Sequence, residues 1–471
     1  MEQHQKRGGD GEGRKPVIVL PEPVRQILSV LHGAGYEAYV VGGCVRDSLL
    51  GREPEDWDIT TSAKPEQTKA LFRRTIDTGI QHGTVTVMLG GKGYEITTYR
   101  IDGAYEDGRH PKQVSFTASL SEDLRRRDFT INAMAYSEEE GVIDLFCGME
   151  DLEAGVIRAV GDPAERFTED ALRIMRAVRF SAQLGYEIEE ETKRAISKIA
   201  PNLRKVSAER IQVELTKLLC SAHPDDLRIA WETGMTGIFL PEFDACMETP
   251  QHNPHHRYSV GEHILHSLPE VRPDKVLRLA MLLHDIGKPL CRTTDADGTD
   301  HFHGHAEKSA GMAEQILRRL KYDNDTIRRV ERLVRYHGLT IEETPAGMRR
   351  AIVEVGEELF PLLFEVKYAD GAAQSEYRLP EKKELLARWR ELYDGVMERG
   401  DCLNLKQLAV SGKDLIVAGM KPGEQLGQTL QAMLRDVLER PQDNTREYLM
   451  EHFGPQAGCG GEEQDGTEDR G

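Results

Sequence analysis

The chain reads Tyr36-Glu-Ala-Tyr-Val-Val-Gly-Gly-Cys-Val-Arg-Asp-Ser-Leu-Leu-Gly51, then Asp56-Trp-Asp-Ile-Thr60, and this stretch decides the fold. The pattern predicts an apolar strand, a Gly-Gly turn, a short helix with Arg46 near its start, and a second strand that carries two aspartates. Side chains alternate faces along a strand, so Asp56 and Asp58 are expected to point the same way, about 7 Å apart.

This arrangement suits the chemistry of nucleotides. Two carboxylates on one face bind hard divalent cations, and Mg²⁺ is usually held by one or two carboxylates together with substrate phosphates. Gly42 and Gly43 allow backbone amides to approach an anion, and the following helix N-terminus favours negative charge. A triphosphate that bridges the turn and a metal pair would be ready for nucleotidyl transfer. The alternative is a solvated turn with two acidic residues on an edge strand.

A third carboxylate candidate follows in a predicted hairpin. The runs 84–89 and 94–99 are rich in β-formers and flank the glycine-rich turn 90–93. Glu95 lies on the second of these strands and could either join the metal site or be an exposed strand residue.

Two further segments could contact a nucleotide. The polar segment 102–111 is either an ordinary surface loop or a mobile active-site loop. In Leu124-Arg-Arg-Arg-Asp-Phe-Thr-Ile-Asn-Ala-Met-Ala135, Arg127 and Asp128 enter an apolar run and could bind ribose and phosphates.

Thr168-Glu-Asp-Ala-Leu-Arg173 is expected to begin a helix, capped by Thr168. On that helix Glu169, Asp170 and Arg173 would share one face, either as internal ion pairs or as a base-reading group. Cytosine and adenine both present an amino donor beside a ring-nitrogen acceptor, whereas uracil and guanine reverse that pattern. A carboxylate and a guanidinium could therefore select CTP and ATP together without a template.

The order of these motifs resembles two nested families. The first stretch is similar to the signature of the nucleotidyltransferase superfamily that includes DNA polymerase β. With Arg-Arg-Asp-Phe-Thr-Ile-Asn-Ala and Glu-Asp-Ala-Leu-Arg, residues 18–245 resemble a bacterial (class II) CCA-adding tRNA nucleotidyltransferase, with a further match at 408–415. The resemblance implies that Asp56 and Asp58 hold Mg²⁺. It also implies nucleotide contacts from Gly42, Gly43, Arg46, Arg127, Asp128 and Arg176, and base selection by Glu169, Asp170 and Arg173.

A histidine-rich module follows, in which ten of the 16 histidines fall between residues 252 and 337. Imidazoles and carboxylates from separate helices can converge on one or two divalent metals and activate water for phosphoester hydrolysis. Leu282-Leu-His-Asp-Ile-Gly-Lys-Pro289 resembles the HD phosphohydrolase superfamily. That resemblance implies His263, His284, Asp285 and Asp370 as core ligands, His305 and His337 as ligands of a second metal, and 2′,3′-cyclic phosphodiesterase or phosphatase activity. The metal would be Ni, Mn, Co, Fe or Mg.

Composition limits the other classes of protein. A length of 471 residues predicts about three domains. The formal net charge of −19 argues against a protein that coats nucleic acid, but local patches such as 125–127 and Arg173, Arg176 and Arg179 could bind RNA. The sequence contains no run of 18 apolar residues, so we expect no membrane span. The polar N-terminus lacks a signal peptide's apolar core, and seven scattered cysteines without a CxxC pair favour a cytoplasmic protein.

We therefore expect an α+β fold: a polymerase-β-like palm with a small mixed sheet and helices, followed by all-α neck, body, HD and tail domains. The expected boundaries are a flexible leader (1–17), the head (18–147), a neck and body for nucleotide selection and RNA binding (148–250), the HD domain (251–380), a tRNA-binding tail (381–455) and a disordered acidic tail (456–471).

The expected reaction is addition of C, C and A from CTP and ATP to the tRNA 3′ end. The expected partners are the tRNA acceptor arm and both nucleotides, without a membrane or an obligate protein partner. The alternatives are an A-only-adding enzyme and a poly(A) polymerase. A CC-only enzyme would have a shortened mobile loop, and a protein uridylyltransferase would lack the Glu-Asp-Ala-Leu-Arg motif.

Overall fold

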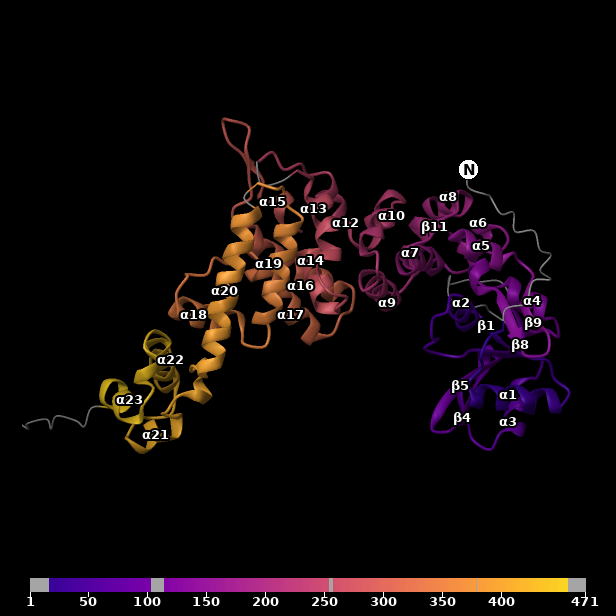
Figure 1. Cartoon of the computed structure of the whole chain (residues 1–471), viewed down its shortest axis with the longest axis horizontal. Helices are drawn as coiled ribbons and strands as arrows, with labels where there is room; N and C mark the ends of the chain where they lie inside the picture. Colours follow the sequence, from indigo (N-terminus) through magenta and orange to yellow (C-terminus); the bar gives the residue numbers. More distant parts are fainter. Residues whose placement is uncertain (1–16, 103–113, 254–256, 378, 456–471) are drawn as a thin grey trace, which may run out of the picture. The chain divides into compact units, whose positions relative to one another are not determined.

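The computed structural model describes residues 17–102, 114–253, 257–377 and 379–455 (Figure 1). The expected acidic tail, nearly all of the expected leader and most of the loop 102–111 lie outside these residues. The chain divides into two compact units. Unit 1 comprises residues 1–250, 259–279 and 315–324, and unit 2 the remainder.

The head of unit 1 contains a seven-stranded mixed sheet in the order β3-β4-β5-β2-β1-β8-β9. Only the β2–β5 pair is parallel; the other neighbours are antiparallel. The strands are β1 (Ala38–Val41), β2 (Ile59–Thr61), β3 (Thr75–Gly79), β4 (Thr84–Leu89), β5 (Lys92–Thr98), β8 (Met134–Ser137) and β9 (Gly141–Asp144), and β6 (Arg100–Asp102) pairs separately with β7 (Val114–Phe116).

The predicted hairpin is confirmed, because β4 and β5 pair antiparallel from Thr84↔Thr97 to Leu89↔Lys92. Its turn, Gly90-Gly91, has φ values of +59° and +83°, which glycine adopts without strain. Helices α1 (Glu22–Gly33) and α3 (Pro65–Leu71) pack beside the sheet (Figure 1). All four residues of β1 are buried, so this strand lies in the core of the head.

The rest of unit 1 is helical, as expected after residue 147. Two-residue strands do occur there, because β10 (Val156–Ile157) pairs with β11 (Glu187–Ile188). The expectation that the segments after the head contain no strands was therefore wrong. The helices are α2 (Gly43–Leu49), α4 (Leu120–Arg125), α5 (Gly148–Ala154), α6 (Pro163–Glu169), α7 (Leu172–Leu184), α8 (Glu190–Ile199), α9 (Ala208–Leu219), α10 (Leu227–Glu232), α11 (Thr236–Phe239), α12 (Pro241–Met247) and α13 (Val260–Ser267).

Unit 2 is a set of helices with one short hairpin, β12 (Thr293–Thr294) and β13 (Asp300–His301). Helices α14 (Lys275–Leu283) and α16 (His305–Arg319) cross the boundary between the units. The other helices are α15 (Lys288–Cys291), α17 (Asn324–Tyr336), α18 (Pro345–Val355), α19 (Phe360–Ala372), α20 (Leu379–Arg399), α21 (Gly412–Val417), α22 (Glu424–Glu439) and α23 (Arg446–Phe453). Within the described residues, no helix combines the length and apolar character needed to cross a bilayer.

A buried polar network joins the head to α7. The Asp128 carboxylate accepts from Arg176 Nε at 2.7 Å and from Asn132 Nδ2 at 3.1 Å, and Asn132 Oδ1 accepts from Arg46 Nη1 at 2.7 Å. Burial would disfavour the Asp128 anion, but Arg176 and Asn132 outweigh that cost and hold its pKa well below the usual range. Next to this network, the Phe129 ring meets the Phe180 ring edge-on at 5.8 Å.

Asp128→Asn should lower the free energy of unfolding by about 3 kcal/mol at pH 7, because it leaves the Arg176 charge without its partner. This value is at the low end for a buried pair because the Arg176 side chain is 34% exposed. The pKa is depressed in the folded state, so the contribution is present above the unfolded pKa of about 3.9 and is lost as the pH falls below it. Urea unfolding at pH 7 and pH 3 measures this, with exposed Glu165→Gln as control. An equal difference at both pH values would contradict the ion-pair assignment.

Candidate functional site

The Gly-Gly turn and the two aspartates meet at one edge of the sheet. β1 ends at Val41 and its antiparallel neighbour β2 starts at Ile59, so these two ends adjoin. The Val41 amide donates to the Asp58 carbonyl at 3.0 Å. The structure corrects one detail, since Asp56 and Asp58 directly precede β2 and do not lie on it.

A cavity of about 730 Å³ opens at this edge. That volume lies in the range of roughly 300–1,000 Å³ typical of ligand pockets. The cavity brings together acidic, glycine and arginine candidates that are up to 134 positions apart in the sequence. They are Gly42, Gly43, Arg46, Asp56, Asp58, Arg127, Asp128 and Arg176, and Arg179 and Phe180 also line the cavity. The remaining candidates Glu95, Glu169, Asp170 and Arg173 are not among its lining residues.

Glu95 nevertheless lies level with the aspartates. β5 pairs in parallel with β2, with Ile96 opposite Ile59, so the preceding residues Glu95 and Asp58 share the other face. Loss of solvation raises the pKa of Asp58, Arg127 opposes that rise, and Asp56 adds to it. Loss of solvation, then repulsion from Asp58 and Asp56, also raises the pKa of Glu95. Three carboxylates that repel one another are a candidate site for a divalent cation.

Arg127 reaches this acidic group because residue 42 is glycine. Gly42 has φ +82°, and a Cβ there would lie 2.9 Å from Arg127 Nη1. Arg127 Nη2 also lies 3.5 Å from the buried Asp123 carboxylate, which accepts from Thr60 Oγ1 at 3.1 Å. Asp123 was not singled out from the sequence, although an acid four residues before an arginine is a recognisable helical pair.

Three guanidinium groups surround the Phe180 ring. The Cζ atoms of Arg46, Arg176 and Arg179 lie 4.9, 5.4 and 3.8 Å from its centroid. Glu214 of α9 balances part of this charge through Arg179 Nε, at 2.6 Å. Cations can interact favourably with a ring face, so Phe180 makes cation–π contacts with the arginines that line the cavity. The sequence indicated the arginine cluster but neither Phe180 nor Glu214.

The structure changes the arrangement expected for 168–173. Helix α6 starts after Asp162, which caps it, so Thr168 is inside that helix and is not its cap. Asp170 has φ −142° and ψ 103°, which ends α6 before α7 begins. Glu169 and Arg173 still pair across the break, at 2.7 Å.

The Asp170 carboxylate pairs with Arg210 of α9 and not with Arg173. Arg210 Nη2 donates to Asp170 Oδ2 at 2.7 Å, and Nη1 donates to Oδ1 at 3.2 Å. Arg173 donates to the carbonyls of Arg166 and Arg126. Of the internal ion pairs that the sequence left open as an alternative, Glu169–Arg173 is present, whereas among the described residues the side-chain hydrogen bonds to the Asp170 carboxylate come from Arg210. Sequence reasoning missed Arg210 because it lies 40 positions away on another helix.

In unit 2, three histidines present the same ring nitrogen to one aspartate. Nδ1 of His284, His305 and His337 lies 2.7 Å from the carbonyl oxygen three residues earlier in each case. A carbonyl only accepts, so each Nδ1 carries the proton and a neutral ring keeps a lone pair on Nε2. Asp285 lies 3.3 to 3.7 Å from those three Nε2 atoms.

This geometry calls for a cation. Nε2 of His305 and Nε2 of His337 are only 3.2 Å apart. Without a cation between them, the lone pairs of two neutral rings would face each other. Burial, with the charge of His284, lowers the pKa of His337 to about 4, which keeps the ring in the neutral form that binds metals. The ligand atoms of Asp285, His305 and His337 all lie within 4.8 Å of one another.

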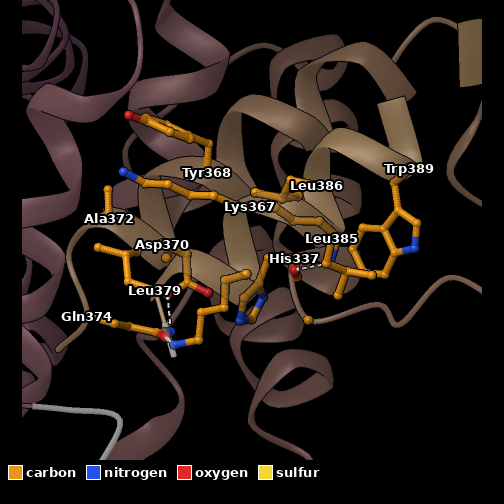
Figure 2. Close-up of a pocket in the computed structure, with 14 residues that line it drawn as sticks. His337, Lys367, Tyr368, Asp370, Ala372, Gln374, Leu379, Leu385, Leu386 and Trp389 are labelled. Carbon is orange, nitrogen blue, oxygen red and sulfur yellow. Dashed lines mark hydrogen bonds between the residues drawn. The ribbon is translucent and has the colours of Figure 1, made fainter. Parts of the chain in front are cut away.

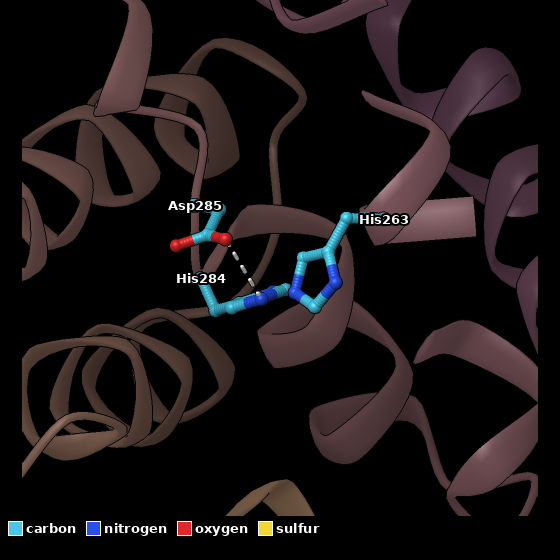
Figure 3. A group of neighbouring side chains, drawn as sticks. All are labelled: His263, His284 and Asp285. Carbon is cyan, nitrogen blue, oxygen red and sulfur yellow. Dashed lines mark ion pairs between the residues drawn. The ribbon is translucent and has the colours of Figure 1, made fainter. Parts of the chain in front are cut away.

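Two further expected ligands lie beside this group. Asp370 Oδ1 is 3.9 Å from His284 Nε2. Figure 3 draws His284 and Asp285 with His263 of α13, a further candidate ligand. Helix α13 belongs to unit 1, whereas His284, Asp285, His305, His337 and Asp370 all belong to unit 2.

Three family models match the chain. "Poly A polymerase head domain" matches residues 38–158, "Probable RNA and SrmB- binding site of polymerase A" matches 185–247, and a second tRNA nucleotidyltransferase domain matches 304–453. A CCA-adding enzyme of Levilactobacillus brevis is 39% identical over 87% of this chain and 91% of its own length. A CCA-adding enzyme of Lactobacillus helveticus is 38% identical over 90% of this chain and 95% of its own length.

Solved structures agree in fold. The CCA-adding enzyme of Bacillus stearothermophilus in complex with CTP has a TM-score of 0.69 and 30% identity, over 92% of this chain and 98% of that one. The Thermotoga maritima CCA-adding enzyme complexed with tRNA has a TM-score of 0.55 and 20% identity, over 92% of this chain and 95% of that one. At this identity the likeness concerns the fold alone.

Asp285→Asn should remove the bound divalent metal from unit 2, because Asp285 is the one carboxylate that all three Nε2 atoms approach. Metal analysis of the purified protein measures this as a loss of about one equivalent or more. His303→Ala is the matched control, since His303 is exposed and stacks on His301. Undiminished metal content in a folded Asp285→Asn protein would refute the site.

Proposed function

This chain belongs to the family of CCA-adding enzymes, tRNA nucleotidyltransferases that add C, C and A from CTP and ATP, and we propose that the cavity at Asp56 and Asp58 is its transferase centre. The observation that carries this is one cavity lined by Asp56 and Asp58, by the Gly-Gly turn and by five arginines. The relatives named above are CCA-adding enzymes, which favours full addition over A-only addition or poly(A) synthesis.

The residues of this cavity divide the work of transfer. Mg²⁺ held by Asp56, Asp58 and Glu95 would supply charge neutralisation at the triphosphate and activation of the attacking hydroxyl. Arg127 lies beside Asp58 and Gly42, where it would bind the phosphates and balance their charge. The tRNA 3′-hydroxyl gives up its proton to water and its oxygen forms a bond to the α-phosphorus. The bond between the α-phosphorus and the oxygen that bridges to the β-phosphorus breaks, and pyrophosphate leaves. Arg176, fixed by Asp128, would bind the triphosphate from α7.

We assign base selection to Asp170 and Arg173, supported by Glu169. In the structure Arg210 donates two hydrogen bonds to the Asp170 carboxylate. That contact fixes the orientation in which Asp170 would accept from the amino group of cytosine or adenine. Arg210 is therefore a positioning residue for selection.

The substrates follow from this assignment: CTP, ATP and the acceptor arm of tRNA, which we expect the helical segments 148–250 and 381–455 to bind. A cytoplasmic location remains our expectation for this protein.

We propose a second activity, phosphoester hydrolysis, at the histidine cluster of unit 2. A divalent metal held by His284, Asp285, His305, His337 and Asp370, with His263 as a further ligand, would supply Lewis acidity and an activated water. Imidazole ligands favour Ni, Mn, Co or Fe, and Mg is the alternative. Water oxygen forms a bond to phosphorus, the ester P–O bond breaks, and the alcohol oxygen takes the proton. Lys288 Nζ lies 2.7 Å from an Asp285 carboxylate oxygen and brings a positive charge beside this ligand.

Two substitutions should separate the two activities. Asp58→Ala should lower both C and A addition at least about 10³-fold, since a metal ligand is lost, and should leave hydrolysis of a 2′,3′-cyclic nucleotide intact. Asp285→Asn should do the reverse. Incorporation of labelled nucleotide into tRNA measures the transferase activity, and hydrolysis of the cyclic nucleotide measures the second activity. Both assays use the same preparations. Near wild-type incorporation by Asp58→Ala would exclude the metal assignment, and loss of incorporation in folded Asp285→Asn would mean that the sites are coupled.

Arg210→Met should reduce discrimination of CTP and ATP against UTP and GTP by about tenfold or more, because losing a charged hydrogen bond costs at least 1.4 kcal/mol. The ratio of kcat/KM values measures this. The matched control is Arg204→Met, an exposed arginine nearby. Unchanged selectivity in Arg210→Met would show that Arg210 does not position Asp170 for base selection.

A further inference from the structure

A cavity of about 220 Å³ opens beside the metal cluster of unit 2. It is lined by two of the candidate ligands, His337 and Asp370, and by residues of α19 and α20 (Figure 2). In that view the His337 ring and the Asp370 side chain lie next to each other, so the cavity reaches the cluster itself.

One stripe of α20 forms the far wall. Leu379, Lys382, Leu386 and Trp389 recur at three- and four-residue intervals, which places them on one helical face. Trp389 is buried, whereas Leu379 and Leu386 are only half-buried. Apolar side chains that line a cavity and remain partly uncovered provide a surface for the apolar part of a ligand.

The other end of the cavity is polar and tied to a metal ligand. Gln374 Nε2 donates to Asp370 Oδ1 at 3.0 Å, and Lys382 Nζ donates to Gln374 Oε1. Lys382 thus brings a positive charge from α20 to within two hydrogen bonds of Asp370. A phosphate held at the metal cluster would therefore have an ammonium group beside it.

The near wall is fixed by Lys367. Its Nζ donates to the carbonyls of His337 and Leu339, at 2.8 and 2.6 Å, and lies 5.4 Å from the Trp389 ring. These contacts connect the segment from His337 to Leu339, which begins at a candidate metal ligand, with Trp389 of α20. Lys367 thus bridges the segment after His337 and Trp389 at this wall of the cavity.

We propose that this cavity is the substrate subsite of the hydrolytic centre and takes a nucleoside phosphate. The phosphate lies at the Asp370 and Lys382 end, and the base lies against Leu386 and Trp389. The volume is below the roughly 300–1,000 Å³ of pockets for larger ligands, so it admits one base and not an oligonucleotide. This assignment rests on the proposed hydrolase function, in which water attacks phosphorus and the nucleoside oxygen leaves with a proton.

Leu386→Trp should fill the cavity without touching a metal ligand. For 2′,3′-cyclic AMP we expect KM to rise at least about tenfold, with kcat and metal content unchanged. Hydrolysis of glycerol 2-phosphate, which has no ring to place, should be unaffected. Leu290→Trp is the matched control, because Leu290 is 66% exposed on α15 and does not line the cavity.

Binding provides a readout independent of turnover. AMP should quench tryptophan fluorescence of the metal-free wild-type protein and should bind at least about tenfold more weakly to Leu386→Trp. Lys382→Met should weaken binding of AMP but not of adenosine, because only AMP carries the phosphate.

The outcomes distinguish the two proposals. No AMP binding to the wild-type protein, or a wild-type KM in Leu386→Trp, would overturn the subsite. Cavity-dependent AMP binding without hydrolysis of either ester would support the subsite and overturn the hydrolase function.

Discussion

The buried Asp128 carboxylate is the constraint on which the first unit depends. It accepts from Arg176 of α7 and from Asn132, which in turn accepts from Arg46 of α2. A buried charge is tolerated only when its partners are in place, so these three contacts must form together. The network thereby fixes arginines from two distant segments on one cavity, and the Gly-Gly turn that carries Arg46 is oriented by a helix more than 120 positions later in the chain.

The two candidate metal centres share an electrostatic principle with different chemistry. In the head, Asp56, Asp58 and Glu95 repel one another and Arg127 compensates only in part. In unit 2, the imidazole lone pairs of His305 and His337 face each other at 3.2 Å. In the proposed function, a divalent ion balances the charges or lone pairs at the centre of each cluster. Carboxylates suit Mg²⁺, whereas imidazoles suit transition metals, so the two centres need not compete for the same metal.

Much of the fold could be predicted because local rules determine it. Alternating β-formers around Gly90-Gly91 gave the hairpin, and the change to helical periodicity after residue 147 marked the end of the sheet. The position of Asp56 and Asp58 just before β2 could not be predicted, because a strand's first residue depends on where its neighbours begin to pair. The minimal strands β10 and β11 escaped notice for the same reason: two residues carry no periodic signal.

The sequence by itself determined the candidates for the chemistry, because the Gly-Gly turn, the Asp-X-Asp pair, the arginine clusters and the His-Asp motif are each short and local. Only the tertiary structure decided which of them act together. Asp170 and Arg173 looked like partners on one helix, but the helix breaks at Asp170 and its carboxylate turns to Arg210 on α9. Side-chain partners across helices are fixed by packing and charge compensation between elements far apart in the chain, and no spacing within a single segment encodes them.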